Sequence, residues 1–446
     1  MLRCAAMRRT LLDFSAIIVA LFAISAVAAS DLTESKNRRQ RAAKQFSDGV
    51  LLIHSRTHVD AVADGYREEA AFYYLTGLED CPGAILAIDG KSGESWLFVR
   101  PARPGETPEA PAGDASAQRL GFDRVVDWMD LDAFLAQRAR PGAKIYYQQG
   151  IGELPGNLLV SKDSRAPAWI QVLEKKWPAA GFAPVGVKLY TLMAVESAAQ
   201  QEATRAAARA TVTAVMAGMK AIRPGVSQRS VELIVEAACW NAGAHGVSFW
   251  PWVMAGVNGV FPKPFESDTR YDHLNATMQA GDLVRLDVGC EWQHYQGDLG
   301  RTVPVSGHYT EEQREIWNMF VAAYRTGVKE LREGSTEDQV FGAWKNELLR
   351  HRETTKTALA SKAIQAWTDR KNVPYWQMHT TNLEAGNIAG ALRAGMVIDF
   401  EPIASIGGQG YYLEDMFLIT KDGAEVLTPG VPYTAEEIES AVAAKR

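Results

Sequence analysis

The sequence has few cysteines, and they follow no regular spacing. Only four occur in 446 residues, at Cys4, Cys81, Cys239 and Cys290. This excludes a zinc finger and the dense disulfide framework of a small secreted scaffold. Cys4 lies in an N-terminal segment that we expect to be removed. The other three leave two alternatives open: one bridge formed in an oxidising compartment, or three buried free thiols.

The chain also has little uninterrupted apolar sequence. Its one pronounced run, Phe14–Val27, is shorter than the roughly 20 residues that a membrane-spanning helix requires. Arginines precede this run and small residues at 26–30 follow it, which is typical of a cleavable secretory signal. We predict a signal peptide at residues 1–29 and an exported protein, periplasmic or secreted, with no stable membrane span after cleavage. The alternative is an uncleaved signal that anchors the chain in a membrane.

The chain also has fewer basic residues than acidic residues. The formal net charge is -6, and removal of residues 1–29 takes away three arginines and Asp13, a net +2, which makes it -8. An acidic surface argues against nucleic acid as a partner. Hydrophobic residues at 47% and charged residues at 22% are ordinary globular values. Because 446 residues exceed one compact core, we expect two or three domains.

The first predicted domain covers residues 30–189. From Gly49 to about Val185, short apolar runs alternate with helical stretches. The runs with the composition of strands are GVLLIHS, FYYLTG, AILAID, SWLFVRP and KIYYQ. This pattern predicts a small α/β domain with a mixed sheet. The Pro- and Gly-rich segment 101–116 is a predicted exposed loop.

A second domain, residues 190–446, is predicted where strong helix formers begin after Tyr190. Helices are expected at about 194–222, at 227–242, from Thr310, at 336–350 and, as a short one, from Thr434. The strand runs between them are LVRLDVG, RTVPVS, MVIDFEPI and YYLEDMFLIT. Helices and hairpin strands in separate blocks indicate an α+β domain.

Two predicted hairpins each place two acidic residues opposite one another. The first turn is assigned to Trp292-Gln293. The second is Gly407-Gly408, because paired glycines tolerate the positive φ of tight hairpin turns. Directly opposed residues lie close together, and like charges there repel. The opposed acids are Asp287 with Asp298 in the first hairpin and Glu401 with Glu414 in the second.

Two acidic pairs inside apolar strands require an explanation. One alternative is a solvated sheet edge, where water screens the repulsion. The other is a divalent cation, which converts the repulsion into ligation and prefers hard oxygen donors. The acids have apolar neighbours, which favours the cation: Leu286, Val288, Ile398 and Phe400.

The strand runs that carry these acids resemble those of a known enzyme family. The runs GDLVRLDVG, GDLGRT, DFEPI and YYLED look like the metal-binding strands of aminopeptidase P, prolidase and methionine aminopeptidase, the pita-bread metallopeptidases. Upstream, EEAAFYYLTGLED followed by LFVRP is similar to the N-terminal domain shared by aminopeptidase P, prolidase and creatinase. The resemblance covers about residues 45–440. It implies a C-terminal pita-bread domain of the α+β class preceded by a smaller α/β creatinase-type domain.

Carried over position by position, the resemblance implies a two-metal site. Asp287 would bind one metal ion and Glu401 the other. Asp298 and Glu414 would bridge both ions. The family's fifth ligand is a histidine, and the nearest match here is His379.

The histidine segment departs from the family pattern. The preferred alignment makes His379 the ligand and leaves Gly386 where a second histidine is expected. A rival alignment puts His379 in that second place and offers Asn372 as the ligand position. The family also has a histidine before its first aspartate strand, where this chain offers Lys263 or Arg270, with His273 nearby.

The resemblance implies hydrolysis of amino-terminal Xaa-Pro peptide bonds in proline-containing peptides, and a homo-oligomer. Two divalent ions would generate a bridging hydroxide, with Glu401 as proton acceptor and His379 stabilising the tetrahedral intermediate. Manganese is the first candidate metal, and cobalt or zinc are alternatives. The missing histidines support another reading, a silent or altered-substrate homologue that binds metal or peptide without this hydrolysis. A metal-free creatinase-like enzyme is disfavoured, since its chemistry needs no acidic cluster.

Overall fold

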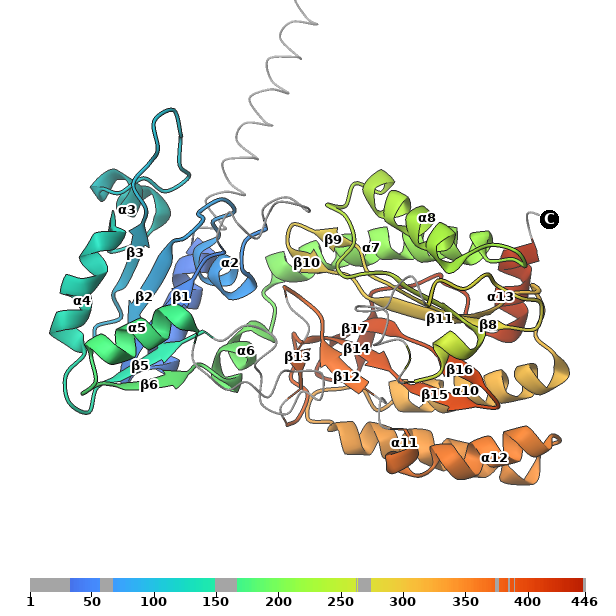
Figure 1. Cartoon of the computed structure of the whole chain (residues 1–446). Coiled ribbons are helices and arrows are strands. Elements are labelled where there is room, and N and C mark those ends of the chain that lie inside the picture. The colour runs from blue at the N-terminus through green and yellow to red at the C-terminus, as the bar shows by residue number, and fades with distance from the viewer. Residues whose placement is uncertain are drawn as a thin grey trace, which may run out of the picture. The chain divides into compact units, whose positions relative to one another are not determined.

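The computed structural model describes residues 33–56, 67–148, 167–261, 263, 274–373, 377–383, 386–388 and 390–443. The predicted signal peptide lies outside these ranges. Within them, no helix combines the length and the apolar character needed to cross a membrane. The chain divides into two compact units, one ending at Met193 and the other running from Ala194 to Arg446. Figure 1 shows their elements.

The first unit is built on a six-stranded mixed sheet with the order β4-β3-β2-β1-β5-β6. Strand β1 is antiparallel to β2 and parallel to β5. The strands are Gly49–His54 (β1), Ile85–Asp89 (β2), Ser95–Val99 (β3), Arg124–Asp127 (β4), Lys144–Tyr147 (β5) and Gly181–Pro184 (β6). Their buried side chains pack against the helices of the unit to form its core. The predicted α/β class of this part is confirmed.

The run FYYLTG is helical, which makes its prediction as a strand wrong. It lies in α2 (Ala70–Thr76), where Glu69 accepts a hydrogen bond from the backbone of Phe72 and Gly77 ends the helix with a φ of 69°. Short aromatic runs fit either element by composition, and here the two caps decide. The other helices are residues 33–45, Asp114–Leu120 (α3), Leu131–Arg138 (α4), Ala168–Lys176 (α5) and Val187–Met193 (α6).

The helices of the second unit begin at strong capping residues. Thr310 and Thr336 each form a capping box with the glutamine three residues later, and Ser227 caps the helix that follows it. These starts were all predicted from the sequence, and they are confirmed. The helices are Ala198–Ala221 (α7), Gln228–Asn241 (α8), Glu311–Val328 (α10), Glu337–Arg350 (α11), Ala358–Trp367 (α12) and Ala435–Ala443 (α13).

The strands of the second unit form two larger sheets and two hairpins. The sheets have the orders β11-β8-β7 and β13-β12-β14-β17-β18, and the hairpins are β9/β10 and β15/β16. A bridge between Gly300 and Glu414 connects the two larger sheets. The strands are Trp252–Ala255 (β7), Leu283–Val288 (β8), Glu291–Trp292 (β9), Tyr295–Gln296 (β10), Leu299–Pro304 (β11), Gln377–Thr380 (β12), Gly386–Asn387 (β13), Val397–Glu401 (β14), Ile403–Ile406 (β15), Gln409–Tyr412 (β16), Asp415–Ile419 (β17) and Ala424–Val426 (β18).

The first hairpin turn differs from its prediction. Tyr295 pairs with Trp292, so the turn residues are Gln293 and His294, with φ values of 49° and 67°. Asp287 consequently lies opposite Gly300 instead of Asp298. This turn could not be predicted from the sequence, because neither central residue is a glycine or asparagine, the usual signal for two positive φ values. A shift by two residues keeps every side chain on its predicted face.

The second hairpin turn is confirmed. Gly407 and Gly408 have φ values of 61° and 75°, and Ile406 pairs with Gln409 beside them. The same register continues between β14 and β17, where Phe400 pairs with Asp415. It leaves Glu401 opposite Glu414, as the sequence predicts.

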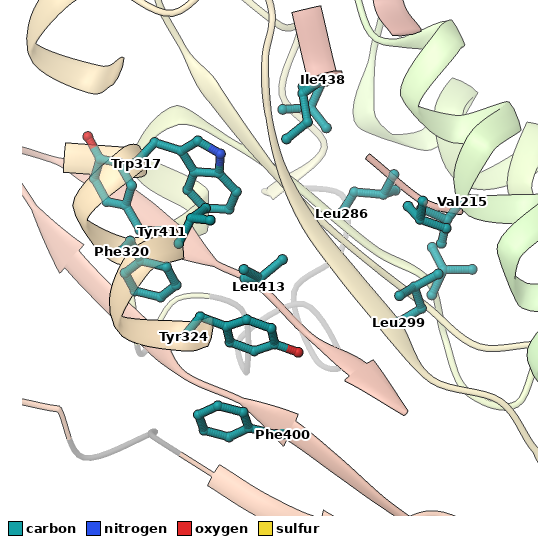
Figure 2. Packing of buried hydrophobic residues seen from close by; sticks show 14 of the residues in the cluster. Val215, Leu286, Leu299, Trp317, Phe320, Tyr324, Phe400, Tyr411, Leu413 and Ile438 are labelled. Carbon is teal, nitrogen blue, oxygen red and sulfur yellow. The ribbon is translucent and has the colours of Figure 1, made fainter. Parts of the chain in front are cut away.

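The apolar faces of the strands pack against helices. In Figure 1, α7 and α8 lie on one side of the strands and α10, α11 and α12 on the other. The ring of Phe400 on β14 stacks on Tyr324 of α10, with centroids 4.9 Å apart. Figure 2 shows Leu286 and Leu299 beside Val215 of α7. Because side chains alternate along a strand, the other face of these strands is available for polar groups.

A disulfide joins Cys239, on α8, to Cys290, just after β8. Their Cα atoms lie 5.5 Å apart. Cys81 is a free, buried thiol in the first unit. Of the two alternatives left by the sequence, the structure therefore contains the single bridge. It connects the end of α8 to the segment that follows the Asp287 strand.

We expect loss of this bridge to destabilise the second unit. The cysteines are 51 residues apart, and closing a loop of that length stabilises a fold by about 4 kcal/mol on chain-entropy grounds. Replacing both Cys239 and Cys290 by alanine should lower the free energy of unfolding by about 2–4 kcal/mol, measured by urea denaturation under oxidising conditions. Cys81→Ala is the control, and it should keep the sensitivity to dithiothreitol. Equal stability of the double variant and the parent would contradict the bridge.

Candidate metal centre

Five predicted ligands come together from separate strands of the second unit. Asp287 lies on β8, and Asp298 directly precedes β11. Glu401 ends β14, and Glu414 directly precedes β17. His379 lies on β12, which pairs with β14. The two bridged sheets thus bring residues more than a hundred positions apart in the sequence to one place.

The imidazole of His379 faces three of the carboxylates. Its Nε2 lies 3.7 Å from Glu401 Oε1, 3.9 Å from Glu414 Oε1 and 4.0 Å from Asp298 Oδ2. These distances exceed hydrogen-bond length. The other ring nitrogen, Nδ1, lies 3.3 Å from the carbonyl oxygen of Thr380. A proton on Nδ1 would be donated there, which leaves the Nε2 lone pair directed at the acids, as a metal ligand requires.

Burial dominates the electrostatics of this cluster. It raises the pKa of Asp287 to about 6, against the opposing charge of Arg285, and the pKa of Glu401 to about 7. Burial and the neighbouring carboxylates raise the pKa values of Asp298 and Glu414 well above the usual range. Burial lowers the pKa of His379. Without a cation, the cluster favours the protonated form of its acids, and burial favours the neutral form of the imidazole.

The unpartnered atoms of the cluster fit a metal ion. Asp298 Oδ1 and Glu414 Oε1 are buried and accept no hydrogen bond from the described residues. Buried carboxylate oxygens without partners are costly unless a cation binds them. Ligand atoms of Asp298, His379 and Glu414 lie within 4.8 Å of one another, together with one from Asp399. Oxygen-rich donors with one imidazole suit a divalent transition metal.

Three further residues of the site were missed from the sequence, and one simple signal could have found them. Each lies two positions before a predicted ligand in an extended segment, so it points to the same face. These residues are Arg285 before Asp287, Asp399 before Glu401, and Tyr412 before Glu414.

Tyr412 connects two of the predicted ligands. Its hydroxyl donates to Glu401 Oε2 at 3.1 Å and is also hydrogen-bonded to Glu414 Oε2. Its ring lies over Gly300, where a Cβ atom would approach the ring carbons to 1.8 Å. Gly300 is therefore required for Tyr412 to reach both carboxylates.

Arg285 brings a positive charge to the edge of the cluster. Its Nη2 donates to Asp287 Oδ2 at 2.8 Å, and only 2% of the residue is exposed. Its guanidinium lies 4.2 Å from the ring centroid of Tyr412 and 4.8 Å from that of Phe261. Aromatic faces stabilise a buried cation. The residue orients Asp287 and offsets part of the negative charge.

A second buried arginine holds the backbone around the bridging positions. Arg301 donates to Asp415 Oδ1 at 2.8 Å and to the carbonyl oxygens of Gly300 and Glu414. Asp415 also accepts from Tyr324 and Thr428. These bonds fix the crossing of β11 and β17, and with it the positions of Asp298 and Glu414.

The rival ligand position lies elsewhere. Asn372 belongs to an exposed 3-10 turn, Arg370–Asn372, whereas His379 faces the acids. Gly386, on β13, carries no side chain that could replace the second histidine of the family. Lys263 is partly buried in a 3-10 turn. Arg270 and His273 lie outside the described residues.

Comparisons with known proteins identify the family of both parts of the chain. Residues 202–421 match the metallopeptidase family M24, and residues 35–146 match the N-terminal domain of aminopeptidase P. The chain is 27% identical to the Xaa-Pro aminopeptidase of Escherichia coli, over 93% of this chain and 98% of that protein. It is also 27% identical to the Xaa-Pro dipeptidase of Pyrococcus horikoshii, over 85% and 95% of the two chains.

Solved structures show the same fold. Aminopeptidase P from E. coli with the inhibitor Pro-Leu has a TM-score of 0.73 at 24% identity, covering 93% of this chain and 98% of that one. Proline aminopeptidase P II from Yersinia pestis has a TM-score of 0.72 at 22% identity, covering 93% and 100%. The predicted fold class, a pita-bread domain after a smaller α/β domain, is confirmed. The chain therefore belongs to the aminopeptidase P family of pita-bread enzymes and is a divalent-metal-dependent metallopeptidase.

Proposed function

We propose that this protein is an exported aminopeptidase that hydrolyses amino-terminal Xaa-Pro peptide bonds. The observation that carries the proposal is the position of His379, whose Nε2 faces Asp298, Glu401 and Glu414 at 3.7–4.0 Å. Relatives named Xaa-Pro aminopeptidase match this chain over nearly its whole length. A proline-containing peptide is accordingly the proposed substrate.

The proposed chemistry uses two divalent ions, held by Asp287, Asp298, His379, Glu401 and Glu414. When bound, such ions would lower the pKa of a shared water to give a bridging hydroxide and would polarise the scissile carbonyl. Glu401 is suited to accept a proton from that water, because Tyr412 already holds its second oxygen. The proposed contribution of His379 to stabilising the tetrahedral intermediate would act through the ion that it holds, because Nδ1 is directed at Thr380 and Nε2 at the acids. Manganese is the first candidate for the ions, with cobalt and zinc as alternatives.

The proposed location is the periplasm or the exterior of the cell, after cleavage near residue 29. The signal-like composition of residues 1–29 supports export. The Cys239–Cys290 disulfide also supports it, because structural disulfides persist mainly in oxidising compartments. A homo-oligomer remains part of the proposal, by family resemblance.

One observation favours a second candidate function. Gly386 stands where the family pattern has a second histidine, so an imidazole that would hold substrate and move protons is missing from that position. A homologue that binds metal or peptide but acts on another substrate, or on none, would share the same metal ligands. Direct measurement of hydrolysis separates the two candidates.

We expect residues 30–446, purified and loaded with manganese, to hydrolyse a tripeptide with proline in second position. The matched peptide with alanine in that position should be a much poorer substrate. Treatment with a chelator should abolish the activity, and added Mn²⁺ should restore it, measured by release of the amino-terminal residue. Two bound ions without hydrolysis would favour the second candidate function. Activity that survives metal removal would contradict the metal-dependent mechanism.

Asp298→Ala should remove both metal ions if Asp298 bridges them. Metal analysis after dialysis is expected to give two ions per chain for the parent and close to none for the variant. Asp338→Ala is the control, because it removes an exposed acid of the same unit. Retention of two ions by the Asp298 variant would rule out a bridging role.

Stabilisation by metal should grow with pH. In the metal-free chain burial raises the pKa of Asp287 from 3.8 to about 6 and that of Glu401 from 4.5 to about 7. The folded chain then binds protons that the unfolded chain has released, so this contribution to stability is present below about pH 4 and is lost as the pH rises through about 6 to 7. The Tm of the chelated protein should fall by several degrees from about pH 5 to about pH 8.

Saturating Mn²⁺ should largely remove this fall, since a cation replaces the protons. Glu401→Gln, which cannot ionise, should show a smaller fall than the parent when chelated. A metal-induced rise in Tm that is the same at both pH values would contradict this account.

A further inference from the structure

Asp399 is a buried acid without a compensating partner. It lies in the middle of β14, fully shielded from solvent. Neither of its carboxylate oxygens has a hydrogen-bond partner among the described residues. An isolated carboxylate in such a place is strongly destabilising, so a fold keeps it only where something offsets its charge.

The two described arginines near the site are hydrogen-bonded to other acids. Arg285 donates to Asp287, and Arg301 donates to Asp415. The groups that act electrostatically on Asp399 are other acids, with Glu414 first among them. Each of these acids raises the free-energy cost of a negative charge on Asp399. No described arginine offsets the charge of Asp399, so either a bound proton or a cation that the protein takes up must do so.

The geometry places Asp399 where such a cation would bind. Asp399 pairs with His379 on β12 and with Met416 on β17. A carboxylate oxygen of Asp399 lies within 4.8 Å of ligand atoms of Asp298, His379 and Glu414. These four donors, three oxygens and one nitrogen, come from four different segments of the chain.

We propose that Asp399 is a sixth protein ligand of the metal centre and binds the ion that His379 holds. This inference rests on the proposed two-metal function and adds a residue to it. An ion held by His379 would thereby have a further anionic ligand, which an ion held by Asp287 would not. The two ions would therefore be bound unequally, the one at His379 more tightly.

The test is calorimetric titration of chelator-treated protein, residues 30–446, with MnCl₂ in the absence of substrate. The parent should show two binding events of different affinity. In Asp399→Asn and Asp399→Val the tighter event should weaken by about 100-fold or more, since even groups that only support a ligand cost 10–100-fold. Valine suits a buried strand position, so the valine variant still tests the proposal if the asparagine variant misfolds.

Thermal stability supplies a second measurement. Both substitutions remove an acid that is buried without a hydrogen-bond partner among the described residues, so the Tm of the metal-free variants should stay the same or rise, while the rise on adding Mn²⁺ should shrink. Ile398→Val is the matched control, because it alters the same strand on its opposite face. It should lower the Tm slightly and leave both Mn²⁺ affinities unchanged.

The possible outcomes separate the explanations. Unchanged Mn²⁺ affinities in both Asp399 variants would overturn the proposal. A lower metal-free Tm with unchanged affinities would show a purely structural role for Asp399. If the parent protein binds no Mn²⁺, the proposed two-metal function is wrong. If the parent binds two Mn²⁺ ions with unequal affinity but does not hydrolyse Xaa-Pro peptides, the role of Asp399 is supported and the proposed activity is not.

Discussion

The mutual repulsion of buried carboxylates governs the second unit of this protein. Asp287, Asp298, Asp399, Glu401 and Glu414 are all at least nine-tenths shielded from water. Arg285 offsets only part of their charge, through Asp287. Burial raises the pKa values of these acids, and repulsion between them adds to the rise in most cases. Such a cluster persists only because a cation, or protons in its place, completes it.

The rest of the unit explains how so much charge can be buried at all. Along β14 the side chains alternate, with Phe400 stacked on Tyr324 of α10 and Glu401 turned to the site. The same division holds on β8, where Leu286 packs toward α7. Apolar burial on one face thus stabilises strands whose other face is electrostatically costly. The stability of the scaffold and the chemistry of the site come from the same residues in alternation.

The sequence was informative where local geometry is strict. Gly407-Gly408 permits few turn types, so the opposition of Glu401 and Glu414 could be predicted. Trp292-Gln293 carried no such information, and the true turn at Gln293-His294 lies one residue later. Asp287 and Asp298 keep their predicted faces because the register error was two residues. The helical state of FYYLTG could not be read from composition, since its caps decide it. Asp399, Arg285 and Tyr412 follow from strand periodicity, but their contacts depend on how the sheets are joined.

The contacts of Arg301 have a consequence for the binding of the proposed ions. Its guanidinium is hydrogen-bonded to the carbonyl oxygens of Gly300 and Glu414 and to Asp415, so it determines where two strands cross without touching a ligand side chain. The backbone around Asp298 and Glu414 is thereby fixed by bonds that need no ion. An ion bound there would cost little conformational entropy, so more of its binding free energy would appear as affinity.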